Sequence, residues 1–217
     1  MILLVLFALK IASGVNRIPG TLQNIAEIIV ESLYNLVESV EKQHAKKYFP
    51  LIATFFIFIL FNNWSGLIPG FGSIGLWEEK EGERILIPFF RAGTADLNTT
   101  LGLALISVIA IQYFGIQSLG IKLYLKKFFN FSNPINFFVG ILEFIGEFTK
   151  IISFTFRLFG NIFAGEVLLA IIVFLVPVFA SIPFLGLEIF VGLIQALVFA
   201  MLTLVFITVA TAGHEAH

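Results

Sequence analysis

One mostly apolar segment of the chain runs from residue 136 to residue 176 without a proline or another strong helix breaker. As a single α-helix, a segment of this length measures about 60 Å, whereas the hydrocarbon core of a bilayer is about 30 Å thick. We therefore expect one membrane helix that bends or lies strongly tilted.

The composition fits a protein that crosses the membrane several times. Of the 217 residues, 59% are hydrophobic and only 12% are charged, which is far from the composition of a soluble domain. The net charge of −1 and the absence of a basic stripe argue against a nucleic-acid partner. The sequence has no Walker-type phosphate loop, no zinc-ligand spacing, no Ser/His/Asp set and no cysteine. We expect no bound nucleotide, no metal and no cofactor.

The pattern of apolar runs predicts an all-α membrane protein of about five to six helices, organised as a single integral membrane domain over residues 1–217. The predicted segments are a short or truncated first apolar segment at 1–12, an amphipathic interfacial helix at 21–41, spans at 48–64 and 96–119, and a hairpin of two long tilted helices at 136–176 and 186–211.

The connections follow from glycine, proline and charged residues. Asp96 or a nearby threonine is expected to cap the span at 96–119. The charged stretch 77–95 and the lysine-containing stretch 120–134 are expected to be loops. Residues 1–12 are too short to cross the bilayer, so they are either an interfacial segment or the end of a truncated span.

Lysine and arginine are unevenly distributed among the predicted loops. Segments 10–47 and 120–134 together hold eight of them, whereas the loop at 63–95 holds three. Because cytoplasmic loops of membrane proteins carry an excess of Lys and Arg, the first two segments are predicted to be cytoplasmic. The long helix at 136–176 then starts from the cytoplasmic side.

Five polar residues of the long segment share one stripe about 80° wide on a helical wheel. They are Glu143, Glu147, Lys150, Arg157 and Asn161. An arginine at membrane depth costs from a few to more than ten kcal/mol, roughly, so the stripe should face protein or water and marks an ion pathway. The structural alternative is a ladder of ion pairs, with Glu147 bound to Lys150 and Arg157 bound to another helix.

An antiparallel hairpin of 136–176 and 186–211 would bring polar residues together in layers. It would place Arg157 level with Gln195, and Glu166 level with Glu188, about 10–14 Å nearer the outer face. Glu143 and Glu147 would lie about 15–21 Å nearer the cytoplasm than Arg157. Carboxylates on both sides of a fixed cation suit two half-pathways that do not join, because the cation repels a passing cation.

Four segments of the chain also carry a resemblance to a known family. RLFGNIFAGE at 157–166, IQALVFAMLT at 194–203, TADLNTT at 94–100 and NWSGLIPG at 63–70 resemble the signature segments of subunit a of rotary F-type ATP synthases. The resemblance extends from about Arg17 to the C-terminus. Two features depart from the family pattern: residues 1–12 are shorter than its first spanning helix, and Glu188 stands where some relatives have histidine.

The resemblance implies a role for each polar residue. Arg157 corresponds to the essential stator arginine that faces the rotor. Asn161, Glu166, Glu188 and Gln195 correspond to the outer half-channel, and Glu143, with Glu147 beside it, to the inner half-channel.

The implied function is that of an ion-translocating stator subunit, which is not an enzyme on its own. Protons, or sodium ions, would use two offset half-channels to reach and leave the rotor, coupling ion flow to rotation and ATP synthesis. The implied partners are the oligomeric c-ring, the b subunits of the peripheral stalk and membrane lipid, with no nucleic acid and no directly bound nucleotide. The expected location is the bacterial plasma (inner) membrane or, alternatively, an organellar energy-transducing membrane.

Two other classes of function are weighed against this one. A stand-alone secondary transporter or channel would be expected to show internal repeats or interrupted helices around a midplane site. An intramembrane enzyme would need a Ser/His pair, paired aspartates or metal ligands, and the sequence has no such set at membrane depth.

Overall fold

The structure is a computed structural model that describes residues 20–68, 75–80, 83–88, 92–128, 133–175 and 181–212. The predicted first segment at 1–12 lies outside these ranges. The chain divides into two compact units, with the boundary between Ala53 and Thr54.

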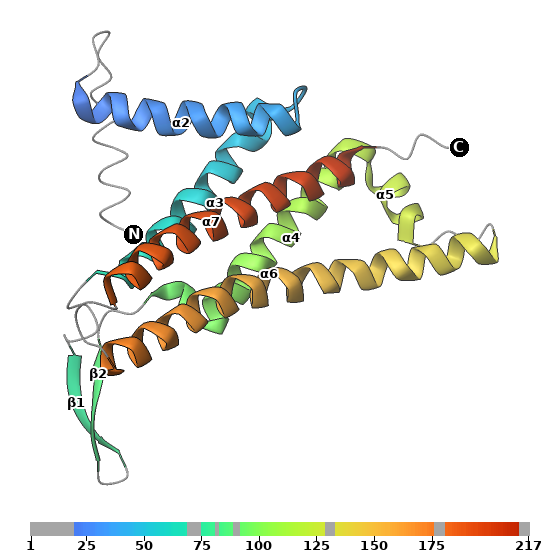
Figure 1. The fold of residues 1–217 in the computed structure, drawn as a ribbon. Coiled ribbons are helices and arrows are strands. Elements are labelled where there is room, and N and C mark those ends of the chain that lie inside the picture. Colours follow the sequence, from blue (N-terminus) through green and yellow to red (C-terminus); the bar gives the residue numbers. More distant parts are fainter. Residues whose placement is uncertain are drawn as a thin grey trace. The chain divides into compact units, whose positions relative to one another are not determined.

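The described residues are almost entirely helical, with one small β-hairpin (Figure 1). In chain order the elements are α2 (Thr21–Val40), α3 (Ala45–Ser65), β1 (Gly75–Lys80), β2 (Glu83–Pro88), the 3-10 helix η2 (Gly93–Ala95), α4 (Leu97–Leu119), α5 (Ile121–Phe128), α6 (Pro134–Leu175) and α7 (Ser181–Thr211). Among these, α3, α4, α6 and α7 are long and apolar enough to cross a membrane. The prediction of a multi-pass, all-α membrane protein is confirmed.

Helix α2 belongs to the N-terminal unit and is amphipathic, as predicted. Leu33 and Val37, four residues apart and so on one face, are buried, whereas Glu31 and Glu38 on the opposite face are exposed. The chain then turns at Glu41, whose carboxylate accepts from the backbone N–H of Gln43 and His44 at 3.2 and 3.3 Å. This side chain therefore satisfies two backbone amides of the turn that leads into α3.

Helix α6 is one continuous helix of 42 residues, which confirms the main prediction from the sequence. It begins at Pro134, and proline suits the first position of a helix because the amide it lacks has no partner there. At 1.5 Å per residue its length is about 63 Å, roughly twice the thickness of a hydrocarbon core.

Helix α7 begins at Ser181, five residues before the predicted start at 186. Pro177 and Pro183 predict that the hairpin breaks across residues 177–185. Pro183, however, falls in the first turn of α7, where the backbone amides have no partner within the helix. A proline is therefore tolerated at this position and does not delay the helix.

The stretch 77–95, expected to be a loop, contains most of an antiparallel hairpin. Strands β1 and β2 pair so that Gly75 lies opposite Pro88 and Lys80 opposite Glu83. Only two residues connect the strands, a length typical of tight hairpins. The expectation was wrong because the run Ile85–Ile87 favours a β-strand in spite of the charged residues around it.

The stretch 120–134, also expected to be a loop, begins with the eight-residue helix α5. Gly120 ends α4 with a φ of +79°, a conformation that favours glycine, and the chain turns there into α5. The backbone N–H of Tyr124 donates to the carbonyl of Gly120 at 3.0 Å, which closes the first turn of the new helix.

The core of the C-terminal unit is built from α4, α6 and α7, each of which packs against the other two. Asp96 caps α4 as predicted, accepting from the backbone N–H of Asn98 at 2.7 Å. Small and polar residues let α4 and α7 approach closely, and the buried hydroxyls of Ser107 and Thr203 are hydrogen-bonded at 2.8 Å. This packing fixes α7 beside α6, where the candidate site lies.

Candidate ion pathway

Helices α6 and α7 form an antiparallel hairpin (Figure 1). Along α6, Lys150 lies over the ring of Phe206 at 4.8 Å, and the ring of Phe154 lies 4.9 Å from that of Phe199. As residue numbers rise along α6, those of the partners fall along α7. The predicted arrangement of two antiparallel long helices is confirmed.

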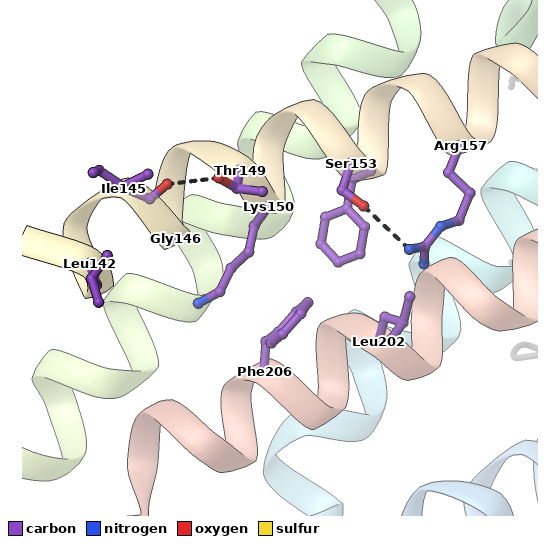
Figure 2. Close-up of a pocket in the computed structure, with 10 residues that line it drawn as sticks. Leu142, Ile145, Gly146, Thr149, Lys150, Ser153, Arg157, Leu202 and Phe206 are labelled. Atoms are coloured by element: carbon purple, nitrogen blue, oxygen red, sulfur yellow. Dashed lines mark hydrogen bonds between the residues drawn. The ribbon is translucent and has the colours of Figure 1, made fainter. Parts of the chain in front are cut away.

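Arg157 is exposed on the surface of α6, and its Nη2 donates to the Ser153 hydroxyl at 3.2 Å (Figure 2). Ser153 is one helical turn earlier on the same helix, so this bond does not connect Arg157 to α7. No carboxylate pairs with Arg157 in the part of the chain that the structure describes. The ladder alternative, in which Arg157 would pair with another helix, receives no support from these residues.

A pocket of about 390 Å³ lies between α6 and α7 beside Arg157 (Figure 2). Most of its lining is apolar, from residues such as Leu142, Leu202 and Phe206. Its polar lining comes from Thr149, Lys150, Ser153 and Arg157, all on α6. Lys150 is paired with Glu147, so the positive character of this pocket comes mainly from Arg157.

Asn161 and Gln195 connect α6 to α7 directly. Asn161 Nδ2 donates to Gln195 Oε1 at 2.7 Å, and Gln195 is only 4% exposed. Gln195 Nε2 is buried and has no hydrogen-bond partner within the described ranges. A buried amide donor without a partner costs about 1–3 kcal/mol and is uncommon in native proteins, so it indicates a site kept for a reason other than stability.

Glu188 is buried on α7, with 6% of its surface exposed, and its carboxylate lies against Gly165 of α6. A side-chain carbon at position 165 would overlap that carboxylate, so only glycine leaves the carboxylate in this place. Glu166, the next residue, is close enough to interact electrostatically with Glu188. The two carboxylates that the sequence placed at one level therefore influence each other electrostatically in the structure.

Two of the signature segments meet at α7, which the sequence analysis did not foresee. The Thr94 hydroxyl donates to Asn63 Oδ1 at 2.7 Å, and Asn63 Nδ2 donates to the Gly192 carbonyl at 2.9 Å. Trp64 Nε1 donates to the Ile189 carbonyl at 3.1 Å. These bonds hold α7 at Ile189 and Gly192, between Glu188 and Gln195.

On the other side of Arg157, Glu147 is held by two donors. Lys150 Nζ lies 2.7 Å from Glu147 Oε1, and Gln112 Nε2 of α4 donates to Glu147 Oε2 at 2.7 Å. The ion pair between Glu147 and Lys150, expected in the ladder alternative, is therefore present. Glu143 is half-buried one turn earlier on α6.

Sequence reasoning missed several of these partners. Ser153 could have been found, because a residue four positions before Arg157 shares its helix face. Gln112 and Asn63 could not have been found by spacing, since each acts on a helix distant in the sequence.

Comparisons with known proteins place the chain in a family. Residues 1–208 match the family model described as ATP synthase A chain. The chain is 37% identical to ATP synthase subunit a of Gloeobacter violaceus over 203 residues, which cover 93% of this chain and 76% of the relative. It is 35% identical to that of Geotalea daltonii (94% and 81% covered) and 33% identical to that of Moorella thermoacetica (99% and 88% covered). The chain therefore belongs to the ATP synthase A chain family, and it is the ion-translocating stator subunit, without a catalytic site of its own, of an F-type ATP synthase.

Proposed function

We propose that Arg157 is the fixed charge that keeps two half-channels apart and faces the rotor ring of c subunits. The observation that carries the proposal is the exposure of Arg157 on a mostly apolar helix that is long enough to span the membrane. A guanidinium left against lipid would be costly. A partner that presents a carboxylate at this depth would cover it and compensate its charge.

The half-channels are assigned to the residues on either side of Arg157. Asn161, Glu166, Glu188 and Gln195 form the outer half-channel in this proposal. Glu143 and Glu147 form the inner one.

The charge of Arg157 has two roles in this mechanism. Its charge attracts the ionised carboxylate of an arriving rotor subunit, which has just released its ion. The same charge repels a proton or sodium ion that would otherwise cross directly between the half-channels. Rotation of the ring is then the only route for net transfer, and the rotor site reloads from the other half-channel.

The remaining partners follow from the same assignment. The b subunits of the peripheral stalk would hold this subunit still while the ring turns, and lipid would cover the outward apolar faces of the spanning helices. The membrane would be the bacterial plasma membrane, and no nucleotide would bind directly to this chain. A stand-alone transporter or channel is not favoured, because the family contains the subunit of a complex.

Cross-linking tests which face of α6 meets the rotor. A cysteine replacing exposed Asn161 should form a disulfide, on mild oxidation of the assembled complex, with a cysteine placed beside the ion-binding carboxylate of a c subunit. Cysteines replacing Leu158 and Ile162 are matched controls, since these side chains are 0% and 5% exposed. They should give no cross-link, and a stronger cross-link from either of them than from Asn161→Cys would contradict the proposed face.

Single-cysteine labelling tests the orientation in the membrane. The chain has no native cysteine, and Lys126 on α5 and Leu76 on β1 are exposed. Because the lysine distribution places α5 in the cytoplasm, Lys126→Cys should react with a membrane-impermeant thiol reagent only from the cytoplasmic side, and Leu76→Cys only from the outer side. The opposite pattern would exchange the inner and outer half-channels.

A further inference from the structure

A chain of hydrogen bonds links α5 to the inner side of α6 through α4. The Tyr124 hydroxyl donates to Gln112 Oε1, and Gln112 Nε2 donates to Glu147 Oε2 at 2.7 Å. The other carboxylate oxygen, Glu147 Oε1, lies 2.7 Å from Lys150 Nζ. Both oxygens of Glu147 are therefore occupied, one from its own helix and one from α4.

The position of Tyr124 is fixed by packing. The residue is only 3% exposed, and its ring lies against Gly115 of α4. A side-chain carbon at Gly115 would come within 2.6 Å of the ring, so glycine here makes the close approach possible. The ring of Phe128 meets it edge to face at 5.6 Å. The phenol is thus aimed at Gln112 by contacts that do not depend on its hydroxyl.

The donor-to-acceptor direction of these hydrogen bonds depends on whether the Tyr124 phenol is protonated. Burial raises the pKa of Tyr124 to about 12, and the nearby carboxylates of Glu147 and Glu143 add to this effect. The phenol therefore stays protonated and remains a donor at physiological pH. A Gln112 amide that accepts from Tyr124 must turn its NH₂ toward Glu147, since the reversed amide would set oxygen against the carboxylate.

We propose that Tyr124 is a positioning residue for Glu147, acting through Gln112 at the inner half-channel. This inference rests on the proposed function, in which Glu147 belongs to that half-channel. Lys150, which Glu147 holds, lines the same pocket as Arg157 (Figure 2). These hydrogen bonds thus connect α5, which was predicted to be a loop, to the charged side chains near Arg157.

A double-mutant cycle in the assembled complex tests whether Tyr124 acts through Gln112. Tyr124→Phe removes the hydroxyl and keeps the ring, and should lower ion-driven ATP synthesis in membrane vesicles roughly twofold to tenfold, the range of one hydrogen bond. Gln112→Leu should lower it at least as much. The double variant should be no slower than Gln112→Leu alone, whereas independent, multiplicative losses would overturn the inference.

A spectroscopic measurement separates this inference from the proposed function. With 3-fluorotyrosine incorporated into the complex, the ¹⁹F signal that disappears in Tyr124→Phe should shift in both Gln112→Leu and Glu147→Gln. A signal that moves in neither variant would overturn the inference even if Arg157 proves essential. Tyr113→Phe is the matched control, because Tyr113 adjoins Gln112 but is 60% exposed; it should leave synthesis and the Tyr124 signal unchanged.

Discussion

Replacing Arg157 with alanine is expected to abolish ion-driven ATP synthesis while the complex stays assembled. The fold should tolerate the change, because Arg157 is exposed and, among the described residues, its side chain bonds only Ser153, at 3.2 Å. ATP synthesis should not tolerate it, since removing a fixed charge aimed at a reacting group lowers the reaction rate by about 10²–10³-fold. The measurement is ATP synthesis by membrane vesicles under an imposed ion gradient, with the passive ion leak recorded in parallel; the leak should rise.

Ser153→Ala is the matched control for this variant. It removes the same hydrogen bond and keeps the charge, so synthesis should stay within about twofold of wild type, as for an exposed hydrogen bond. If Arg157→Ala vesicles made ATP at a rate near wild type, the role of Arg157 as charge and barrier would have to be abandoned.

The parts of the fold that were predictable depend on local sequence and on the thickness of a bilayer. Helix α6 followed from a long apolar run without a breaker, and the cap at Asp96 followed from the residue type before an apolar run. Both outcomes are decided by residues close together in the chain. They do not depend on which helices pack alongside.

The errors arose where a local signal has two physical outcomes. Pro183 reads as a breaker, yet it fits the first turn of α7. The lysines of α5 read as a solvated loop, yet this short helix has a strongly amphipathic pattern and buries Tyr124 against Gly115. In each case the neighbouring elements, and not the residue type, decided the conformation.

For the candidate site, the sequence predicts the approximate level of each polar residue along the hairpin but not its hydrogen-bond partner. The antiparallel hairpin predicted Glu166 level with Glu188, and the two side chains interact electrostatically. It also predicted Gln195 level with Arg157, whereas Gln195 bonds Asn161, one helical turn further along α6. Residue spacing fixes the level of a side chain only to about one turn, and leaves open which side chain points across. Gln112 and Asn63 act between distant helices, so their roles emerge only from tertiary packing.

The tightest steric requirement of the proposed outer half-channel concerns Gly165. Glu188 is buried, and its carboxylate occupies the space that a side chain at 165 would need. Gly165→Ala should therefore push the carboxylate out of its place beside Glu166, at a cost of about 1–3 kcal/mol. If ion transfer needs that placement, synthesis should fall roughly tenfold or more, measured as the initial rate in vesicles at equal amounts of assembled complex.

The shape of the site also predicts how this loss can be reversed. Glu188→Asp shortens the side chain by one methylene, so combining it with Gly165→Ala should recover part of the rate, although Glu188→Asp alone should be slower than wild type. Gly102→Ala on α4 is the matched control, because no heavy atom lies within 4 Å of the added carbon and alanine favours a helix. Synthesis near wild type in Gly165→Ala, or equal losses in Gly165→Ala and Gly102→Ala, would show that the close contact between Glu188 and Gly165 does not govern the outer half-channel.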